Sequence, residues 1–259
     1  GSPQIAFLYG LCAYMTDTMR FGASTVVVER ATPEVLLQTI EKYKATVCFS
    51  TPSGYKLMLD EIDKYDTSSL RLCIAGGEPL APAVFHGWEE KPGVRIINGL
   101  GISELLHIFI SASGDDIRPG LIGTAVPGFE VRVVDENFND TAPGEVGQMI
   151  VKGPNGCRYL DDIDRQKAYI RDGWNLSGDL CIRDEEGYFS YEARTDDMIL
   201  TGGYNVSGLE VEAILMEHAA IREVAVVGSP DANRGQIVKA FIELRDKNAA
   251  GDELVSEMQ

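Results

Sequence analysis

Between residues 20 and 110, apolar runs rich in β-branched side chains alternate with segments whose apolar residues recur at helical spacing. The first helical segment has a clear start, because Thr32 stands at the N-cap position and Pro33 at the first helical position. This alternation predicts βα units and a parallel sheet. The predicted strands are 24–30, 45–52, 70–80 and 94–101, and the predicted helices are 33–43, 53–64 and 81–90.

The pattern changes after residue 114. Short apolar runs broken by Asn-Asp and Pro-Gly turn signals predict a small antiparallel or barrel-like β unit over 115–193. A helix at 207–218 and strands at 222–230 and 236–244 then predict a compact α+β domain, which is expected to be partial because its last helix has nothing left to pack against. The fold class is therefore α/β, with three predicted domains: 1–114, 115–195 and 196–259.

The formal net charge of -17 over 259 residues narrows the range of partners. It argues against nucleic acid and against an anionic membrane surface, because no basic stripe is present to neutralise phosphates. Backbone amides and a metal ion can still bind a phosphate-bearing small molecule. The five cysteines form no CxxC pair, which predicts reduced thiols and a cytoplasmic location. No apolar run reaches the roughly 18 residues of a membrane helix.

Two glycine-containing stretches follow predicted strands. Gly76 and Gly77 come at the end of the third strand, and Gly99 and Gly101 at the end of the fourth. Ligands of open α/β sheets bind at this edge, and glycine lets a flat ring or a phosphate approach the backbone. The simpler interpretation of the first pair is a strand-to-helix turn that stops at Pro79.

A hydroxyl, a carboxylate and an imidazole follow Gly101 closely. Ser103 could donate to a phosphate oxygen, and Glu104 could hold Mg²⁺, which takes few carboxylates together with phosphate oxygens. The alternative for Glu104 is a carboxylate at the start of a helix, where the dipole favours it. His107 stands in an apolar run, so the residues alone favour a buried core histidine.

Further polar residues stand near the last domain boundary. Asp179 follows Gly178 in a turn-like setting, where its carboxylate could accept two ribose hydroxyls; an ordinary turn aspartate is the alternative. Arg194 and the doublet 196–197 precede the glycine pair 202–203. A polar boundary of this kind predicts a hinge between domains, and a plain linker with solvated charges is the alternative.

The order of these stretches is more specific than any one of them. The sequence runs AGGEP, NGLGISE, GEVGQMIVKGP, SGDL and RTDDMILTGGYNVSGLEVE. Over nearly the whole chain, this order resembles the core motifs of the AMP-forming acyl-CoA synthetases, which belong to the adenylate-forming superfamily. The stretches FLYGLCAY and GISELLHIF look most like the benzoate and 2-aminobenzoate CoA ligases. The resemblance implies the adenylate-forming enzyme fold.

The resemblance also implies an activity. A carboxylic acid attacks the α-phosphate of ATP to give acyl-AMP and pyrophosphate, and the thiol of CoA then attacks the acyl carbon and expels AMP. The implied cofactors are ATP, Mg²⁺ and CoA, and the favoured substrate is an aromatic, benzoate-like acid. Two alternatives stay open: a truncated or degenerate nucleotide- or acyl-binding module without turnover, and transfer of the acyl group to a carrier protein.

Individual roles follow from the same resemblance. The implied nucleotide-binding residues are Gly76, Gly77, Glu78, Pro79, Asn98, Gly99, Leu100, Gly101, Asp179 and Arg194. The implied catalytic residues are Ser103 at the phosphates and Glu104 as the Mg²⁺ ligand. The implied acyl pocket contains Tyr9 and His107, the implied hinge is Asp196, and the implied CoA-binding loop is Gly202, Gly203 and Tyr204.

The sequence departs from the family pattern at several places. Leu100 stands where the family usually has a tyrosine that stacks on adenine, and Ala193 stands where a glycine is common. The Ser/Thr/Gly-rich phosphate loop would precede residue 1, and the lysine that contacts the α-phosphate would follow residue 259. We therefore expect a fragment with little or no ligase activity of its own. An uncovered sheet face in such a fragment would favour a homo-oligomer.

Overall fold

The computed structural model describes residues 1–195, 197–231, 233–246 and 250–258. The chain divides into two compact units. The first comprises Gly1–Arg132, Ile150–Ser177 and Arg183–Ser190, and the second comprises Val133–Met149, Gly178–Ile182 and Tyr191–Gln259. The division into the domains 1–114, 115–195 and 196–259 stays a prediction from the sequence.

The first unit contains a five-stranded sheet in the order β1-β2-β3-β4-β5. Strands β1, β2 and β3 run parallel, whereas β4 is antiparallel to β3 and β5 is antiparallel to β4. The bounds are β1 Val47–Ser50, β2 Leu72–Gly76, β3 Ile96–Gly101, β4 Ile108–Ser111 and β5 Thr124–Ala125. The expected α/β class is confirmed, and antiparallel strands extend the parallel part of the sheet.

Three helices accompany the parallel strands: α3 Pro33–Tyr43, α4 Pro52–Leu59 and α5 Pro82–Glu90. Each begins with proline at a position whose N–H has no helical partner in any case. The Thr32 hydroxyl accepts the Val35 N–H at 3.3 Å, and the Thr51 hydroxyl accepts the Gly54 N–H at 3.2 Å. Both hydroxyls therefore cap the start of a helix, which confirms Thr32 as the N-cap of α3.

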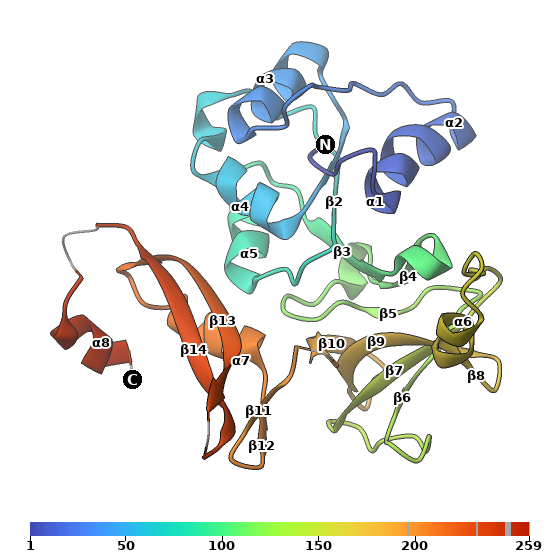
Figure 1. Cartoon of the computed structure of the whole chain (residues 1–259). Helices are drawn as coiled ribbons and strands as arrows, with labels where there is room; N and C mark the ends of the chain where they lie inside the picture. The colour runs from blue at the N-terminus through green and yellow to red at the C-terminus, as the bar shows by residue number, and fades with distance from the viewer. Residues whose placement is uncertain (196, 232, 247–249, 259) are drawn as a thin grey trace. The chain divides into compact units, whose positions relative to one another are not determined.

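The core of the first unit lies between these helices and the sheet. Figure 1 shows α3, α4 and α5 on one side of β2 and β3, and α1 (Leu8–Leu11) and α2 (Asp17–Arg20) on the other. Trp88 and Tyr55 are fully buried, with ring centroids 4.8 Å apart. Trp88 Nε1 donates to the Tyr55 carbonyl at 3.0 Å, and the Tyr55 hydroxyl donates to the Cys48 carbonyl at 2.7 Å. Both buried rings thus have partners for their polar atoms.

The segment 24–30 does not form the expected strand. It is irregular, and Val27 is 63% exposed. Its β-branched residues favour an extended backbone, but a strand also needs a neighbour that supplies hydrogen bonds. Strand β1 is the edge of the sheet, and 24–30 does not extend it. The prediction was wrong because composition reports the local preference and not the pairing.

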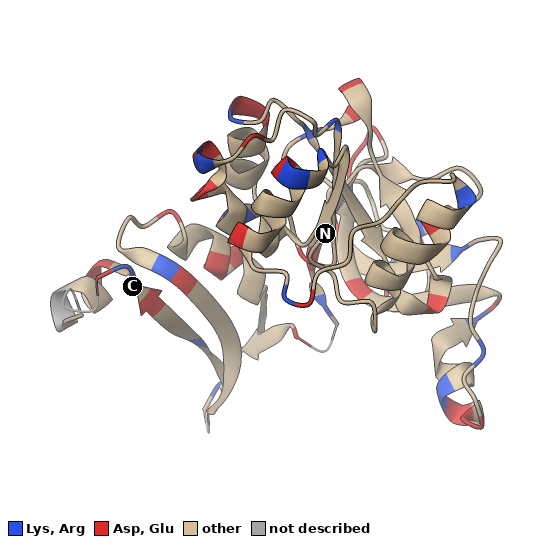
Figure 2. Cartoon of the chain, turned by 90° about the horizontal axis from the view of Figure 1, so that it is seen from above, with Lys and Arg blue, Asp and Glu red and all other residues tan. Residues whose placement is uncertain are grey.

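Figure 2 shows acidic and basic residues at nearby positions along the ribbon of the first unit. Lys91 Nζ lies 2.6 Å from Asp63 Oδ2, and Lys44 pairs with Asp66 in the same way. The Lys44 and Ser68 side chains donate to Asp66 and hold the pKa of that carboxyl below its usual range. Exposed pairs of this kind contribute little to stability.

The chain after β5 is rich in strands, as expected for 115–193. A second sheet has the order β6-β7-β9-β10, and β8 pairs antiparallel with β9. The bounds are β6 Glu130–Val134, β7 Val146–Lys152, β8 Ile170–Arg171, β9 Trp174–Arg183 and β10 Phe189–Arg194. A helix that the sequence reading did not anticipate, α6 Ile163–Tyr169, stands between β7 and β8 along the chain.

The rest of the second unit contains a sheet in the order β12-β11-β14-β13. Its elements are β11 Ile199–Thr201, β12 Tyr204–Val206, α7 Gly208–Leu215, β13 Ile221–Asp231, β14 Gly235–Leu244 and α8 Asp252–Met258. The expected helix at 207–218 and the strands at 222–230 and 236–244 are thereby confirmed. Among the described helices, none has the length and apolar character that crossing a bilayer requires.

Candidate functional site

The two glycine stretches of the first unit meet at one edge of its sheet. Gly76 and Gly99 are register partners at the carboxyl ends of the parallel strands β2 and β3. A Cβ at Gly76 would lie 3.3 Å from the Gly99 oxygen and 3.7 Å from the Tyr9 ring. Gly77 has φ +89°, and a Cβ there would meet no described atom within 4 Å. Gly76 and Gly77 therefore form a stretch of backbone without side chains, called the backbone shelf below. They also begin the turn toward α5 that the simpler interpretation expected.

Glu78 has a structural role that the sequence did not indicate. Its Oε2 accepts the Ser53 backbone N–H and its Oε1 accepts the Ser53 hydroxyl, both at 3.0 Å. Ser53 lies in the first turn of α4, where a negative charge is favourable. The carboxylate is thus engaged inside the unit, and the shelf offers a ligand mainly backbone and the exposed ring of Pro79.

Strand β3 places a polar side chain beside the same edge. The Asn98 side-chain oxygen is buried and has no hydrogen-bond partner among the described residues. The Asn98 carbonyl accepts the Ser111 hydroxyl at 2.7 Å, which ties β3 to β4. Leu100, the residue at the usual tyrosine position, pairs with Ile110 in the β3–β4 ladder. An unpartnered buried oxygen is costly, so a ligand donor at this position would satisfy it.

The residues after β3 form a single 3₁₀ turn, Ser103–Leu105. Ser103 is exposed, and Glu104 is half-buried. Glu104 Oε1 accepts the Tyr159 hydroxyl at 2.7 Å, whereas its Oε2 accepts no hydrogen bond from the described residues. In the described part of the chain, no group of three or more His, Cys, Asp or Glu side chains could hold a metal by itself. A metal at Glu104 would therefore need ligands from elsewhere, as Mg²⁺ on a nucleotide has.

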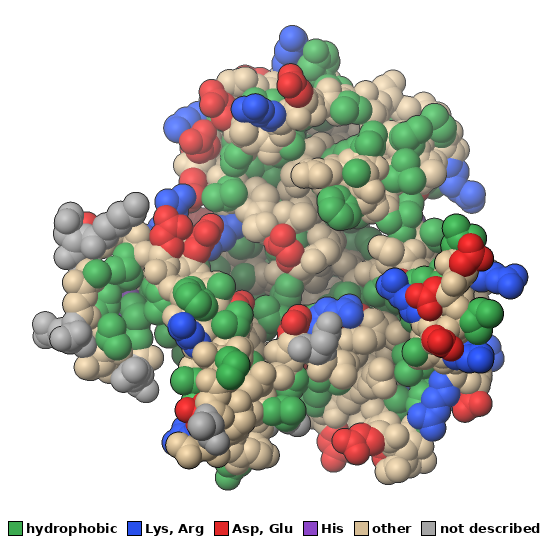
Figure 3. Space-filling model, viewed as in Figure 1, with side chains coloured by type: hydrophobic (Ala, Val, Ile, Leu, Met, Phe, Trp, Pro, Cys, Tyr) green, Lys and Arg blue, Asp and Glu red, His purple; other side chains and the backbone are tan. Residues whose placement is uncertain are grey.

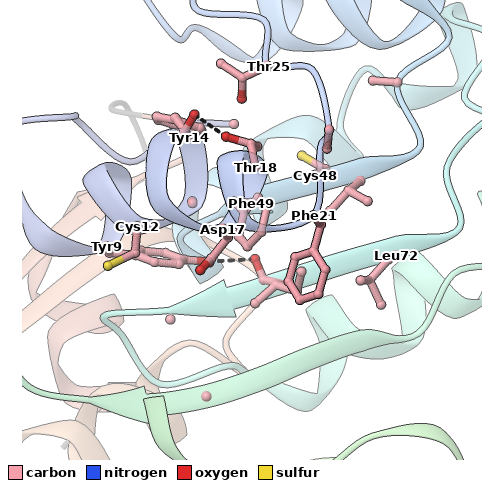
Figure 4. A pocket seen from close by; sticks show the side chains of 18 of the residues that line it. Tyr9, Cys12, Tyr14, Asp17, Thr18, Phe21, Thr25, Cys48, Phe49 and Leu72 are labelled. Carbon is pink, nitrogen blue, oxygen red and sulfur yellow. Dashed lines mark hydrogen bonds between the residues drawn. The ribbon is translucent and has the colours of Figure 1, made fainter. Parts of the chain in front are cut away.

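A cavity of about 1260 Å³ lies in the first unit, beside the same glycine edge. Its lining includes Gly76, Gly99 and Ser103 together with Tyr9 and His107. Figure 4 shows the segment from Tyr9 to Phe21 lying over the sheet residues Phe49 and Leu72, with aromatic rings from both walls. The structure thus brings the two predicted acyl-pocket residues to the same cavity as the predicted phosphate-contacting serine.

Tyr9 is fixed in this cavity by the sheet. Its hydroxyl donates to the Ile74 carbonyl at 2.9 Å, and burial raises its pKa well above the usual range. Its ring lies edge-on to Phe49, with centroids 6.3 Å apart. Because the hydroxyl is already engaged, Tyr9 presents mainly its ring to a ligand.

His107 is not the buried core histidine that its apolar neighbours suggested. Its side chain is 52% exposed, and Nε2 lies 3.8 Å from Asp17 Oδ2. The preceding Leu106 has φ +63°, so the chain turns there and breaks the periodicity that a buried run would keep. The imidazole therefore lines the cavity from its rim.

Two predicted residues of the second unit pair with each other. Asp179 Oδ1 lies 3.5 Å from Arg194 Nη1, and the Asp179 side chain is only 5% exposed. Asp179 lies inside β9 and not in a turn, which corrects the setting that the sequence suggested. Gly178 has φ +77°, and its carbonyl accepts the Thr195 N–H at 2.8 Å. Asp179 is therefore a buried carboxylate that lies beside an arginine, and it does not have the setting of an ordinary turn aspartate. Ala193 is buried in β10.

The implied CoA-binding loop is a two-residue hairpin turn. Thr201 of β11 pairs with Tyr204 of β12, and Gly202 and Gly203 between them have φ +56° and +87°. These angles fit a type I′ turn, in which both central residues need positive φ. Tyr204 is 76% exposed. The predicted hinge, Asp196, lies outside the described residues.

Sequence reasoning missed the partners of Glu104. Tyr159 and Asn155 belong to the irregular segment 153–162 of the first unit and carry no local motif. The Asn155 amide donates to the Leu105 carbonyl, next to Glu104. Burial and the hydrogen bond to Glu104 raise the pKa of Tyr159 to about 12, so this hydroxyl stays a donor near neutral pH.

Comparison with known proteins agrees with this geometry. The model of a family described as AMP-binding enzyme matches residues 3–159, and the model of the AMP-binding enzyme C-terminal domain matches residues 210–259. The chain is 35% identical, over 96% of its length, to the mitochondrial acyl-coenzyme A synthetase ACSM3 of Mus musculus. It covers 43% of that relative, so it spans less than half the length of this curated protein.

Solved structures give the same result. The crystal structure of the anthranilate CoA ligase AuaEII in complex with anthranoyl-AMP matches with a TM-score of 0.89 and 34% identity, over 98% of this chain and 50% of that one. A benzoate CoA ligase from Burkholderia xenovorans LB400 matches with a TM-score of 0.88 and 30% identity, over 99% and 52%. These matches confirm the adenylate-forming fold. Since the family model covers more than half of the sequence, the chain belongs to the AMP-binding enzyme family.

Proposed function

We propose that the whole protein activates a carboxylic acid with ATP and transfers the acyl group to CoA. In the first step, a carboxylate oxygen bonds to the α-phosphorus and pyrophosphate leaves. In the second, the CoA sulfur bonds to the acyl carbon, the thiol loses its proton and AMP leaves. The observation that carries this proposal is the shared cavity, in which Gly76, Gly99 and Ser103 line the same space as Tyr9 and His107.

The glycine edge supports a purine nucleotide. The open space at Gly77 gives a flat ring room to lie against the backbone, and the buried Asn98 oxygen can accept a hydrogen bond from an exocyclic amino group. Adenine carries such a group. The Ser103 hydroxyl is exposed beside this shelf, where it can donate to a phosphate oxygen.

The donor set at Glu104 fits Mg²⁺ bound together with a nucleotide. One carboxylate oxygen without a partner, and no cluster of other ligands among the described residues, suits a cation that takes one or two carboxylates plus phosphate oxygens. When bound, Mg²⁺ neutralises phosphate charge that develops during the displacement. Glu104 would hold the cation, and Ser103 would orient a phosphate oxygen.

The cavity supports an aromatic acid as the substrate. The Tyr9 ring, the Phe49 ring at 6.3 Å from it and the His107 imidazole offer flat surfaces on which an aryl group can pack. Two structural relatives are named for anthranilate and benzoate, which supports the same class. ACSM3 is named only as an acyl-coenzyme A synthetase, so aliphatic acids are the natural comparison in a test.

Residues of the second unit would bind the ribose of the nucleotide and the CoA that accepts the acyl group. Asp179, held beside Arg194, can accept hydrogen bonds from ribose hydroxyls. Gly202, Gly203 and Tyr204 are proposed to bind CoA, and Asp196 is proposed as the hinge about which the C-terminal domain reorients between the two half-reactions. The Tyr204 ring is exposed and the turn before it carries no side chains, so a pantetheine chain could pack against this ring and the glycine backbone.

ATP–pyrophosphate exchange tests the first step. We expect exchange that depends on benzoates more than on fatty acids when the full gene product is assayed, and little or none with the 259-residue chain alone. CoA added to the reaction should then give an acyl-CoA thioester. Nucleotide binding without exchange for any acid would indicate a binding module without turnover. Exchange without CoA transfer would indicate a carrier protein as the acceptor.

A cytoplasmic location and a homo-oligomer remain predictions of this proposal. All five cysteines are free, as suits a reducing compartment. Figure 3 shows hydrophobic side chains gathered on the surface over α1 and α2, where Phe7 is 66% and Phe21 79% exposed. Exposed apolar area of this kind favours association between copies.

A further inference from the structure

The turn that carries Glu104 is tied to a distant part of the chain. The irregular segment 153–162 follows β7, and it makes two hydrogen bonds to this turn. The Tyr159 hydroxyl donates to Glu104 Oε1 at 2.7 Å, and the Asn155 amide donates to the Leu105 carbonyl. One bond restrains the Glu104 side chain and the other restrains the backbone beside it.

Tyr159 is itself held from several sides. Its backbone N–H donates to Gln166 Oε1 at 2.8 Å. The Arg165 guanidinium lies 4.2 Å from the centroid of its ring, and the Tyr169 ring stands edge-on at 5.7 Å. Because both neighbours come from α6, the ring has little freedom to swing, and its hydroxyl stays directed at Glu104.

The two oxygens of the Glu104 carboxylate differ in their hydrogen bonding. Oε1 is occupied by Tyr159, and Oε2 accepts no hydrogen bond from the described residues. A glutamate side chain that must bind a cation loses rotamer freedom when it does so. A side chain that is already fixed loses less on binding, and a hydrogen-bonded carboxylate also keeps a defined orientation.

We propose that Tyr159 is a positioning residue that presents Glu104 Oε2 to the Mg²⁺ of a bound nucleotide, an inference that rests on the proposed function. Asn155 supports the same geometry by fixing the backbone of the turn. If Tyr159 acted only as a structural link, its removal would lower stability and leave the effect of Mg²⁺ on nucleotide binding unchanged. The two possibilities therefore differ in metal dependence.

Calorimetric titration of ATP in the presence of Mg²⁺ and in the presence of EDTA measures this dependence. The Mg²⁺ ratio is the ATP dissociation constant in EDTA divided by the constant in Mg²⁺. Tyr159→Phe removes only the hydroxyl. We expect it to lower the ratio about tenfold, the lower end of the range for partners of metal ligands, with the EDTA value unchanged. Glu104→Gln should bring the ratio close to one.

Tyr188→Phe is the matched control, because the Tyr188 hydroxyl belongs to the same unit but donates to the Asp116 carbonyl, at 3.0 Å, and not to Glu104. It should keep the wild-type ratio. A wild-type ratio in Tyr159→Phe would overturn the inference alone. A wild-type chain without Mg²⁺-dependent ATP binding would overturn the proposed nucleotide site as well.

A second variant covers the case in which Tyr159→Phe does not fold. Gln166→Ala removes the acceptor of the Tyr159 N–H and leaves the hydroxyl in place. It should loosen the ring and lower the Mg²⁺ ratio by a smaller factor than Tyr159→Phe. A Gln166→Ala ratio equal to that of wild type would count against the positioning role.

Discussion

Two Gly-Gly pairs stand where strands end in this chain, and they need glycine for different physical reasons. Gly76 lies between the Gly99 oxygen and the Tyr9 ring, so space is limiting there. Gly202 has φ +56°, and a Cβ there would meet no described atom within 4 Å, so backbone conformation is limiting. The same dipeptide thus marks a close approach in the first unit and a turn in the second.

The difference separates two kinds of binding surface. Gly76 is buried in the sheet edge, where it pairs with the buried Gly99. At Gly202 the hairpin projects an exposed Tyr204, and its shape depends on two backbone angles. Side-chain size should therefore decide the outcome of a substitution at Gly76, and tolerance of positive φ should decide it at Gly202.

Gly76→Val should have the largest effect. Its Cβ would stand 3.3 Å from the Gly99 oxygen, and two further methyl groups would force the strands or Tyr9 to move. We expect a loss of about 3 kcal/mol in the free energy of unfolding, measured by urea denaturation, and loss of ATP binding. Gly251→Val is the control, since among the described residues no atom lies within 4 Å of a Cβ there. Equal stability of the two variants would contradict the close-approach explanation.

At Gly202, the effect of a substitution should depend on whether the new residue tolerates positive φ, and not on its size. Val strongly disfavours positive φ, whereas Asn tolerates it and is common in type I′ turns. We expect Gly202→Val to cost about 2 kcal/mol and Gly202→Asn to cost less than about 0.5 kcal/mol. Amide hydrogen exchange in β11 and β12 measures both. If Asn were as harmful as Val, space and not backbone angle would be limiting in this turn as well.

Tyr9→Phe separates the ring contact at Gly76 from the hydrogen bond that fixes the ring. The substitution keeps the packing and removes the bond to the Ile74 carbonyl. We expect a loss of about 1 kcal/mol in unfolding free energy, with ATP binding retained. Thermal denaturation and calorimetry report the two quantities. Abolished ATP binding with intact stability would mean that the hydroxyl serves the ligand and not the fold.

The glycine turn of the second unit should also depend on pH. The Gly202 N–H donates to the Arg234 carbonyl, and the N–H groups of Arg234 and Asn233 donate to Asp231. These bonds lower the pKa of Asp231. A lowered folded-state pKa gives stability that is present above the unfolded value, about 4, and lost as pH falls below it.

Hydrogen exchange at Gly202 should therefore speed up, relative to the intrinsic rate, as pH falls below about 4. The control is Asp231→Asn, which keeps an oxygen acceptor without the carboxylate, and in it this acid-dependent part should be absent. A variant that keeps the full acid response would place its origin at another group.

His107→Ala should have the smallest effect on stability. Half of its side chain is exposed, so we expect a change below about 0.5 kcal/mol in unfolding free energy. The effect should instead fall on the preference between aromatic and aliphatic acids, measured by pyrophosphate exchange in the full gene product. An unchanged preference and rate would remove His107 from the acyl pocket.

Local signals in the sequence predicted the local parts of the fold. Thr32 and Pro33 define a helix start within two residues, and the structure has the cap in place. The segment 24–30 has an equally clear local preference, yet it is not a strand, because pairing depends on a neighbour elsewhere in the chain. His107 shows the same limit. The chain turns at Leu106, which has positive φ, and His107 lines the cavity instead of the core that its apolar neighbours suggested.

The candidate site was predictable where a motif spans it and not where contacts join distant segments. The glycine stretches were expected at the carboxyl ends of neighbouring strands, and Gly76 and Gly99 are partners there. Glu104 and Tyr159 are 55 residues apart, and Glu78 reaches back 25 residues to Ser53. No spacing rule connects such pairs, because the fold alone brings them together.

The positions of the tryptophans have a spectroscopic consequence. The chain has two, Trp88 in the buried core and Trp174 beside Lys152, and both belong to the first unit. Intrinsic tryptophan emission therefore reports only on that unit, whereas far-ultraviolet circular dichroism reports on both. A single denaturant titration followed by the two signals would show whether the units unfold together or in sequence, without any label.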